Sequence, residues 1–532
     1  MTSEINIGIA QINVLVGGIE QNVDRIIEFA KRAKTEFDCD LLVCSELVLT
    51  GYPPEDLLMR PGFNTRVMQQ LQRLCDEVTE LDLIVGYPKK YSDGYYNIGA
   101  LIQAGKVVHE YRKMKLPNYS VFDEVRYFDA GNEPFVFNYK DVTFGLTVCE
   151  DIWHEGPVEL AVERGADVII NINGSPYHTN KIPERRAVVC EKAAEVATPI
   201  IYVNQVGGQD ELVFDGASFA TDANGEVVHQ EPSFSEALSL VTVSADIEGV
   251  TVKGSKQAPE LAPLESIYTA LVMGVRDYVQ KNGFSGVVIG LSGGIDSALT
   301  TTIAVDALGP ENVDVIMMPF RYTSDISKED AYLEAKALGI QYHVISIEPM
   351  YDEFVKALAP VFEGYEEDTT EENIQSRCRG LTLMAYSNKT GRMVLTTGNK
   401  SEMSVGYATI YGDMVGGFNA IKDVPKITVY ELARYRNTIS QVIPERVITR
   451  EPSAELRPDQ IDQDSLPPYE VLDPILELYV EQDCPPADIV KQGFAEQDVA
   501  KVIRLVDRNE YKRRQAAPGV RISKRAFGRD RR

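Results

Sequence analysis

Apolar and polar positions in the first half of the chain follow two spacings, one typical of helices and one typical of strands. Residues 21–37 (QNVDRIIEFAKRAKTEF) place their apolar side chains on one helical face. Two alternating segments, 99–111 and 218–230, turn at Gly105 and Gly225 and predict hairpins. Short apolar runs predict further strands at 5–12, 40–47, 81–88, 142–149, 166–172 and 199–206. Helices and strands mixed with antiparallel hairpins favour a layered α/β sandwich in this half.

The pattern lapses between residues 248 and 264, where glycine, proline and polar residues dominate. We predict a linker over 248–264, between a domain at 1–247 and a second domain at 265–532. The second domain alternates helices with buried strands, a rhythm typical of a doubly wound parallel sheet. Its predicted elements are a helix at 265–281, a strand at 286–291, a helix from Asp296, a strand at 313–320, a helix at 327–339 and a strand at 342–347.

The overall charge of the chain limits its partners. The 532 residues are 44% hydrophobic and carry a formal net charge of -27. This balance argues against a general attraction to nucleic acid or to an anionic membrane. One stretch differs, because residues 511–532 (YKRRQAAPGVRISKRAFGRDRR) are strongly basic. That end is either a local anion site or a solvated basic tail.

Cysteine usage and the first residues bear on the compartment. The seven cysteines are scattered and form no CxxC pair, so neither a disulfide framework nor a zinc site is expected. The first residues, MTSEINIGIAQINV, do not have the basic and apolar regions of a signal peptide. No apolar run is long enough to span a membrane. We therefore expect a cytoplasmic protein.

A glycine-rich stretch, GLSGGIDS at 290–297, lies between a predicted buried strand and a predicted helix. Glycines let backbone N–H groups converge into an anion nest, and the helix beginning near Asp296 adds its positive N-terminal end. It is not a Walker A loop, because no Gly-Lys-Ser/Thr closes it. The stretch predicts a phosphate site, with an ordinary strand-to-helix turn as the alternative. The predicted phosphate-binding residues are Gly290, Leu291, Ser292, Gly293, Gly294, Ile295, Asp296 and Ser297.

The same stretch resembles the pyrophosphate loop of the ATP pyrophosphatases, which cleave ATP between the α and β phosphates. Three further motifs resemble the NAD synthetase family, as does the basic end: ENIQSRCRG (372–380), TTGNKSE (396–402) and YGDMVGGFNAIKDV (411–424). The resemblance spans the whole second half. It implies a doubly wound ATP pyrophosphatase domain that adenylates the nicotinate carboxylate of deamido-NAD, after which ammonia displaces AMP.

The resemblance also assigns ligands to individual residues of this half. Asp296 and Glu402 are oxygen donors suited to Mg2+, which the family uses with ATP. Thr397 matches an ATP-binding position. Asn373, Glu402 and Lys512 match deamido-NAD-binding positions, which implies that the basic end is an anion-binding lid. A surface or structural role is the alternative for each residue.

The first half offers the groups that release ammonia from glutamine. Ammonium, the main form at neutral pH, has no lone pair for attack, so an attached glutaminase would be an advantage. Such a domain needs a nucleophile, a base and an oxyanion partner. Glu46, Lys113 and Cys149 each lie at the end of a predicted strand. Their order and setting resemble the Glu-Lys-Cys triad of the nitrilase superfamily, which implies an αββα sandwich.

Two motifs, LPNYSVFDE and NINGSPYHTNK, are similar to the glutaminase domain of glutamine-dependent NAD synthetases, and this resemblance covers nearly all of 1–245. In the implied mechanism Glu46 takes the thiol proton of Cys149, which attacks the glutamine amide and forms a γ-glutamyl thioester as ammonia leaves. Lys113 stabilises the oxyanion and is expected to favour the thiolate. Glu46 then activates water to release glutamate.

Two residues compete for these roles. Lys115 would point the same way as Lys113 on a strand, and the spacing to LPNY in the superfamily favours Lys113. Cys44 is the alternative thiol, but it lies inside a predicted strand and is expected to pack in the core. Cys149 ends its strand and is the predicted nucleophile.

Three further residues, Tyr119, Ser175 and Lys181, match glutamine-binding positions of the family. The third position is arginine in some members, and lysine keeps the charge but loses the planar fork. Trp153, the single tryptophan of the chain, is expected to be structural.

The resemblance predicts a glutamine-hydrolysing enzyme of the NAD synthetase family that uses deamido-NAD, ATP, Mg2+ and glutamine and passes ammonia between its sites through protein. Family members are homo-oligomers, so we expect one here, with no nucleic-acid or membrane partner. Two other functions stay open: a different ATP pyrophosphatase amidotransferase, acting on xanthylate or a tRNA base, and a non-catalytic metabolite sensor. The complete triad and loop argue against the sensor, and the missing basic face argues against RNA.

Overall fold

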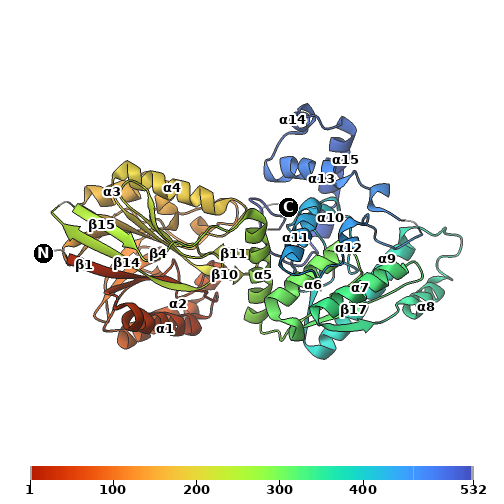
Figure 1. Cartoon of the computed structure of the whole chain (residues 1–532), viewed down its shortest axis with the longest axis horizontal. Helices are drawn as coiled ribbons and strands as arrows, with labels where there is room; N and C mark the ends of the chain where they lie inside the picture. The colour runs from red at the N-terminus through yellow and green to blue at the C-terminus, as the bar shows by residue number, and fades with distance from the viewer. Residues whose placement is uncertain (1–2, 248, 459, 529–532) are drawn as a thin grey trace. The chain divides into compact units, whose positions relative to one another are not determined.

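The chain forms two compact units, each with its own core. The computed structural model describes residues 3–247, 249–458 and 460–528. Figure 1 shows the chain coloured from red at the N-terminus to blue at the C-terminus. The first unit comprises Met1–Gln209 and Val213–Leu261, and the second comprises Asp210–Leu212 and Ala262–Arg532.

The first unit contains two large sheets. One has the strand order β15-β14-β1-β2-β3-β4-β5 and the other β13-β12-β9-β8-β7-β6. The first sheet consists of β15 (Gly249–Gly254), β14 (Ala237–Asp246), β1 (Ser3–Gln11), β2 (Leu41–Val43), β3 (Asp82–Lys90), β4 (Tyr95–Gln103) and β5 (Lys106–Arg112). The second consists of β13 (Val227–Gln230), β12 (Phe219–Thr221), β9 (Ile200–Asn204), β8 (Val168–Asn173), β7 (Val142–Val148) and β6 (Phe135–Tyr139). The short strands β10 (Val206–Gln209) and β11 (Leu212–Asp215) form a separate two-stranded sheet.

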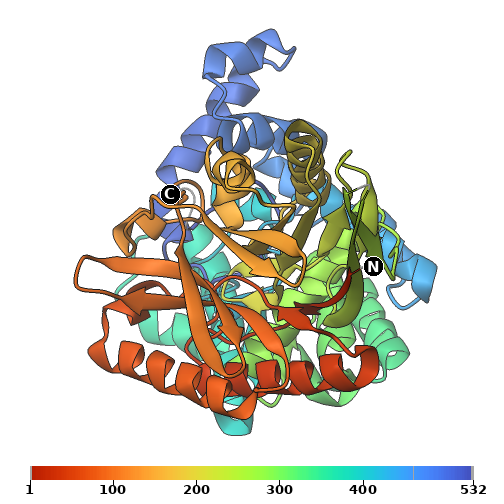
Figure 2. The same cartoon turned by 90° about the vertical axis from the view of Figure 1, so that its left-hand side faces the viewer.

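Two layers of helices enclose these sheets. Helices α1 (Ile19–Phe37) and α2 (Pro61–Glu77) pack on the first sheet, while α3 (Pro157–Glu163) and α4 (Lys181–Val196) pack on the second. Figures 1 and 2 show the two layers on opposite sides of the strands. The order of layers is α, β, β, α, which confirms the predicted sandwich.

The core of this unit lies between its two sheets. Successive side chains of a strand point to opposite faces, so Ile5, Ile7 and Ile9 of β1 all enter the core. They join Phe144 of β7 and Ile170 of β8, which come from the facing sheet. Burial of these apolar faces fixes the strand registers and therefore the places where strand ends meet.

One strand lies within the predicted linker. Residues Gly249–Gly254 form β15, which pairs antiparallel with β14, and α5 (Pro263–Lys281) begins before the predicted linker ends. The sequence pattern conceals β15 because it begins and ends with glycine. Only Val252 of this edge strand is buried, so the apolar alternation is short.

The second unit is built on a five-stranded parallel sheet with the order β18-β17-β16-β19-β20. Its strands are β16 (Val287–Gly290), β17 (Val313–Met317), β18 (Gln341–Val344), β19 (Met393–Thr396) and β20 (Phe418–Asn419). From β16 the chain adds β17 and then β18 on one side of the sheet. It then returns to the other side of β16 and adds β19 and β20 there. The structure therefore confirms the doubly wound sheet, and its switch point lies between β16 and β19, where such sheets bind ligands.

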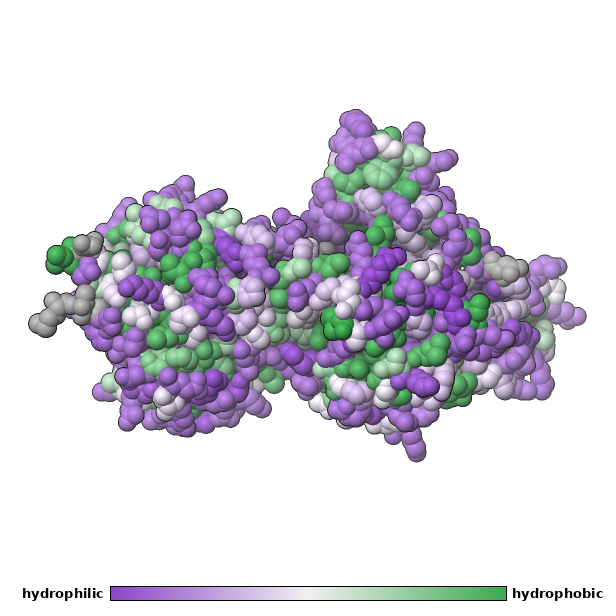
Figure 3. Space-filling model, in the orientation of Figure 1, coloured by the Kyte–Doolittle hydropathy of each residue, from purple (hydrophilic) through white to green (hydrophobic). Residues whose placement is uncertain are grey.

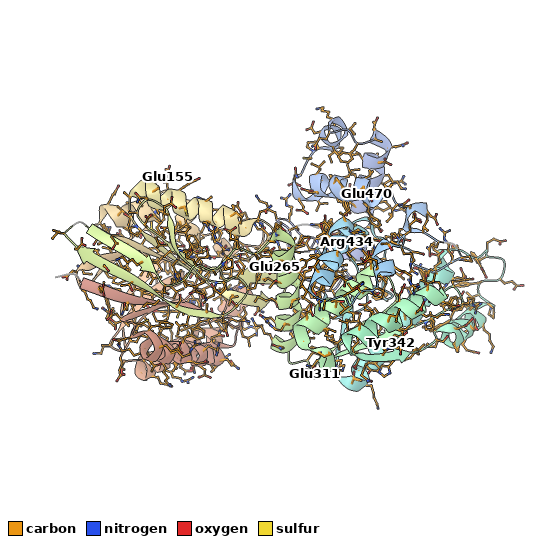
Figure 4. The ribbon with its side chains drawn as sticks, in the orientation of Figure 1. Glu155, Glu265, Glu311, Tyr342, Arg434 and Glu470 are labelled. Atoms are coloured by element: carbon orange, nitrogen blue, oxygen red, sulfur yellow. The ribbon has the colours of Figure 1, made fainter. Side chains whose placement is uncertain are left out.

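Helices of the second unit pack on both faces of the sheet. Helix α6 (Ile295–Leu308) packs with α5 and α11 (Lys426–Ile439), while α9 (Thr369–Thr390) packs against β16 with α8 (Glu348–Leu358) beside it. Figure 4 labels Glu265 in the first turn of α5 and Tyr342 on the edge strand β18.

Hydrophilic residues cover most of the visible face of each unit (Figure 3). After the sheet, the second unit continues as a group of helices with its own apolar cluster. The helices of this part include α13 (Tyr469–Leu476), α14 (Pro486–Lys491) and α15 (Glu496–Arg508). Among the residues that the structure describes, none of the helices combines the length and the apolar character that a membrane span requires.

Candidate active sites

The predicted nucleophile lies at the end of a buried strand. Cys149 directly follows β7 and begins the short 3-10 helix η3 (Cys149–Trp153). Its φ is 47°, a left-handed conformation that a non-glycine residue adopts at a sharp turn. The side chain is 3% exposed. Burial raises the pKa of the Cys149 thiol well above its usual value, and the nearby Glu46 adds to this rise.

Lys113 favours the thiolate of Cys149, as expected, but it does not suffice alone. Lys113 does lower the pKa of this thiol, but burial and the carboxylates around it outweigh the lysine. A neutral thiol at this place needs a base to take its proton.

A buried ion pair lies beside the thiol. Lys113 and Glu46 are both fully buried, and Lys113 Nζ lies 2.7 Å from Glu46 Oε1. Asn97 Nδ2 donates to the same oxygen at 2.7 Å, and the Gly174 N–H donates to Glu46 Oε2 at 2.8 Å. These donors fix the orientation of the Glu46 carboxylate. The strand β2 ends at Val43, earlier than predicted, and the chain turns beyond it to bring Glu46 to this place.

A second carboxylate, which the sequence analysis did not single out, completes the cluster. Glu124 is 5% exposed, and its two oxygens lie 2.9 and 3.0 Å from Lys113 Nζ. Tyr52 Oη donates to Glu124 Oε1 at 2.8 Å. Burial raises the pKa of Glu124 to about 7 although Lys113 lowers it. Burial by itself would lower the pKa of Lys113, but Glu124 and Glu46 raise it well above its usual value.

Geometry separates the two alternative residues from this cluster. The described hydrogen bond of Lys115 runs from its backbone N–H to Asp151 Oδ1, at 2.8 Å. Cys44 is fully buried, and burial raises the pKa of its thiol to about 12. Lys113 is therefore the lysine that lies with Glu46.

Charged and aromatic side chains lie near Cys149. Tyr119 Oη donates to the buried Glu150, at 3.0 and 3.1 Å from its two carboxylate oxygens. Lys181 Nζ lies 4.0 Å from the ring centroid of Trp153, a cation–π contact. Burial lowers the pKa of Lys181. Ser175, 3% exposed, follows β8. The tryptophan that was expected to be structural thus contacts a predicted glutamine ligand.

In the second unit, the glycine-rich stretch joins β16 to α6 as predicted. Gly293 has a φ of 81°, and a Cβ there would lie 2.3 Å from the Ser327 carbonyl oxygen. Ser297 Oγ donates to the Gly294 carbonyl oxygen at 2.9 Å and accepts from the Ser292 N–H at 3.2 Å. This close packing restricts position 293 to glycine and sets the loop at the N-terminal end of α6.

A cavity of about 520 Å³ opens at this loop. Its size is in the range of small-molecule sites. All the predicted ATP-binding and deamido-NAD-binding residues line it except Gly293. They are Gly290, Leu291, Ser292, Gly294, Ile295, Asp296, Ser297, Asn373, Thr397, Glu402 and Lys512. Residues far apart in the sequence therefore meet at the carboxyl ends of β16 and β19.

The two predicted metal-binding carboxylates lie on either side of a lysine. Lys426 Nζ is 2.5 Å from Asp296 Oδ2 and 3.1 Å from Glu402 Oε1. Asn399 Nδ2 donates to Asp296 Oδ1 at 2.8 Å, and Asn399 Oδ1 accepts from the Glu402 N–H at 2.9 Å. Burial raises the pKa of Glu402 to about 8 although Lys426 lowers it. Lys426 and Asn399 were not predicted as site residues.

The basic end of the chain is packed into the second unit over the part that the structure describes. Lys512 Nζ donates to the carbonyl oxygens of Gly406 and Ala408, at 2.7 Å each. The N–H groups of Ile522 and Ser523 donate to Asp423 Oδ2 at 2.9 and 2.7 Å. Within 511–528 the basic end is thus not a solvated tail. Residues 529–532 of the predicted basic stretch lie outside the described residues.

Comparison with known proteins gives a separate family match for each half of the chain. The sequence profile described as "Carbon-nitrogen hydrolase" matches residues 6–251, and the profile described as "NAD synthase" matches residues 267–516. The glutamine-dependent NAD(+) synthetase of Acinetobacter baylyi is 50% identical over 99% of this chain and 97% of its own length. The chain belongs to the glutamine-dependent NAD(+) synthetase family.

Further relatives agree with this membership. The glutamine-dependent NAD(+) synthetase of Thermotoga maritima is 44% identical over 99% of this chain and 97% of its own length. The structure of the Acinetobacter baumannii glutamine-dependent NAD(+) synthetase in complex with adenosine diphosphate superposes with a TM-score of 0.82 and 47% identity, covering 100% of this chain and 98% of the other. The Cytophaga hutchinsonii synthetase, at 22% identity and a TM-score of 0.85, shows the same fold.

Proposed function

We propose that this member of the glutamine-dependent NAD(+) synthetase family converts deamido-NAD to NAD, using ATP and glutamine and releasing AMP, pyrophosphate and glutamate. The observation that carries the proposal is the pairing of two sites on one chain. One unit holds a buried cysteine beside a lysine and two glutamates, and the other holds a pyrophosphate-type loop that lines a cavity.

The geometry of the first unit supports an amide hydrolase with Glu46, Lys113 and Cys149 as catalytic residues. Glu46 takes the proton of the neutral Cys149 thiol, and the sulfur attacks the amide carbonyl of glutamine. The Lys113 ammonium, 2.7 Å from Glu46, is the proposed stabiliser of the oxyanion that forms. Ammonia leaves with the proton that Glu46 returns, and a thioester remains. Glu46 then takes a proton from water, which attacks the thioester carbonyl. The C–S bond breaks, glutamate leaves, and Glu46 returns the proton to the Cys149 sulfur.

Charges near the thiol support an amino-acid amide as the substrate of this unit. Free glutamine carries an α-ammonium and an α-carboxylate. The buried Glu150, adjacent to Cys149, presents a carboxylate, and Lys181 presents a cation on the same unit. Tyr119 donates to Glu150, and Ser175 is buried after β8. We propose Tyr119, Ser175 and Lys181 as glutamine-binding residues.

The cavity of the second unit supports adenylation of a carboxylate. The N–H groups of the loop at 290–297 and the N-terminal end of α6 provide an anion site for the phosphates of ATP. We propose that Thr397 binds ATP in the same cavity, and that Asn373, Glu402 and Lys512 bind deamido-NAD. A carboxylate is a poor acyl electrophile, so activation as an acyl-adenylate precedes attack by ammonia.

The charge of this cavity supports a divalent cation as the cofactor. Among the described residues, seven carboxylate side chains and four cationic side chains line it, yet both proposed substrates are anions. The carboxylates are those of Asp296, Glu372, Glu402, Asp413, Glu451, Glu455 and Asp462. No group of three or more His, Cys, Asp or Glu side chains among the described residues is placed to bind a metal without other ligands.

The donor set fits Mg2+, which proteins commonly bind through one or two carboxylates together with substrate phosphates. We propose Asp296 and Glu402 as its protein ligands. When bound, the ion would neutralise phosphate charge beside the two carboxylates. On the family resemblance we also propose a homo-oligomer located in the cytoplasm.

One assay tests the proposal against its two alternatives. The purified chain is incubated with ATP, Mg2+ and glutamine, and with either deamido-NAD or xanthylate as acceptor. NAD and pyrophosphate should form in equal amounts with deamido-NAD only. Amidation of xanthylate would indicate a different ATP pyrophosphatase amidotransferase, and the absence of product with both acceptors would indicate a non-catalytic protein.

A further inference from the structure

Four cationic side chains of the described residues line the cavity of the second unit, and their hydrogen-bond and ion-pair partners differ. Lys426 contacts two carboxylates, those of Asp296 and Glu402. Lys512 donates to two backbone carbonyl oxygens. The other two are arginines, Arg379 and Arg450. Lys426 contacts the glycine-rich loop through the carboxylate of Asp296, whereas Arg450 contacts it through the carbonyl oxygen of Gly293.

Arg450 follows the short helix α12 (Glu445–Thr449) and spans two neighbouring segments. Its Nη2 donates to the Gly293 carbonyl oxygen at 3.2 Å and to Ser327 Oγ at 3.0 Å. Gly293 is the loop residue whose Cα faces the Ser327 backbone. The guanidinium therefore lies against the centre of the loop, where the loop meets α7 (Asp325–Leu338).

Glu455 also binds the start of α7 and so holds residues 450–455 in place. Glu455 Oε1 accepts from Ser324 Oγ at 2.9 Å and from Ser327 Oγ at 2.8 Å. Arg450 and Glu455, five positions apart, thus hold residues 450–455 to one pair of serines at the start of α7. Both residues also line the cavity, so this fastened segment forms one of its walls.

The described partners of the Arg450 guanidinium are neutral oxygens, so its positive charge is not cancelled by direct contact with a carboxylate. The charge of Lys426, in contrast, is shared with two carboxylates. A guanidinium has five N–H donors in a planar fork that matches phosphate oxygens, and the described bonds use one nitrogen of it.

We propose that Arg450 binds the β and γ phosphates of ATP and stabilises the pyrophosphate that leaves. This inference rests on the proposed function. In the adenylation step an oxygen of the substrate carboxylate attacks the α phosphorus and forms a new P–O bond. The bond between the α phosphorus and the bridging oxygen breaks, and that oxygen leaves with the electron pair as part of pyrophosphate. No proton moves. Negative charge grows on the group beside Arg450, which makes its stabilisation specific to the transition state.

The test uses the full chain with ammonium as nitrogen source, so that glutamine hydrolysis is not required. Arg450→Gln should lower kcat for pyrophosphate release about 10²-fold, the usual effect of losing one oxyanion donor. It should also weaken product inhibition by pyrophosphate about 10-fold or more, while inhibition by AMP changes little. Arg450→Lys keeps the charge without the fork and should recover part of both effects.

Arg446→Gln is the matched control. Arg446 belongs to α12 and pairs with Glu329 and Asp330 of α7, but it does not line the cavity. It should lower the melting temperature and leave inhibition by pyrophosphate unchanged. If Arg450 only links α12 to α7, Arg450→Gln will behave as Arg446→Gln does, and the proposal is wrong.

Two readouts keep the result clear. Thermal unfolding of each variant reports that the second unit is folded, because Arg450 and Arg446 both belong to that unit. If Arg450→Gln does not fold, Arg450→Lys must still show weaker inhibition by pyrophosphate than the unaltered chain, and equal inhibition overturns the proposal. If the unaltered chain forms no NAD at all, the proposed function fails instead.

Discussion

Lys113 Nζ lies 2.7 Å from Glu46 Oε1, and neither side chain has exposed surface. The same nitrogen contacts Glu124 at 2.9 Å. One cation thus neutralises two buried carboxylates in addition to its proposed role beside the oxyanion. Removing a buried ion-pair partner commonly costs about 3–5 kcal/mol, because the remaining charge stays unpaired.

Lys113→Ala should therefore affect both rate and stability. We expect glutaminase rates to fall by about 10²–10³-fold, since the oxyanion loses its donor. The melting temperature of the first unit should fall as well. Lys115→Ala, whose described hydrogen bond uses only the backbone, should retain both properties. Glutamate release and thermal unfolding of the two variants decide the matter, and a dead Lys115→Ala would reverse the assignment.

Cys149→Ala should separate the two chemistries. Glutamine-dependent NAD formation should disappear, because no thioester forms without the sulfur. Formation of NAD from added ammonium salt should remain near normal, because the cavity at 290–297 belongs to the other unit. The measurement is NAD yield with each nitrogen source. Loss of both activities in a folded variant would falsify the two-site interpretation.

Asp296→Asn should abolish adenylation with either nitrogen source. The substitution preserves the shape of the side chain but removes the charge that pairs with Lys426, and it removes one proposed Mg2+ ligand. Basal glutamate release should survive. Pyrophosphate release with ammonium is measured beside glutamate release without ATP. Near-normal pyrophosphate release would place the metal on other residues.

Glu334 should make the stability of the second unit depend on pH. Burial raises the pKa of this carboxyl group to about 8, and Thr302 Oγ1 is its described hydrogen-bond donor, at 3.4 Å. The folded state holds this proton more tightly than the unfolded state, where the pKa is about 4.3. The resulting stability is complete below that value and is lost as pH rises towards 8, by at most ~1.4 kcal/mol per pH unit.

Glu334→Gln should remove this dependence, since the amide cannot ionise. Free energies of unfolding, measured with denaturant between pH 5 and 8, should fall more steeply for the unaltered chain than for the variant. Parallel pH profiles would show that Glu334 is ionised in the folded protein at every pH in this range.

The folds of both units could be predicted from the spacing of apolar residues along the chain. Alternation of period two in segments such as 5–12 and buried runs such as 286–291 follow directly from how strands bury their faces. The strand β15 was missed because its single buried residue gives no such pattern. The end of β2 was placed too late because apolar residues continue past Val43 into a turn.

Some site residues could be predicted from the sequence, and others are recognised only in the folded structure. Positions with a motif, such as Cys149 or the loop at 290–297, could be proposed from the chain alone. Glu124 lies within LPNYSVFDE but is one of many acidic residues, and only the fold shows that it meets Lys113. Lys426 lies 130 positions from Asp296, so no local pattern could connect them. Contacts of this kind depend on tertiary packing, which the sequence does not display.

The ammonium of Lys426 gives the chain an internal competitor for any external cation. A divalent ion that approaches Asp296 and Glu402 alone must displace a charge already bonded to both carboxylates. An ion that arrives with a polyphosphate brings new anionic partners for the displaced lysine. The exchange then leaves no unpaired buried charge on Lys426. The carboxylates should therefore discriminate against the bare ion and accept the nucleotide-bound one. Calorimetric titration should show little binding of Mg2+ by itself and clear binding once ATP is present, and tight binding of the bare ion would contradict this exchange.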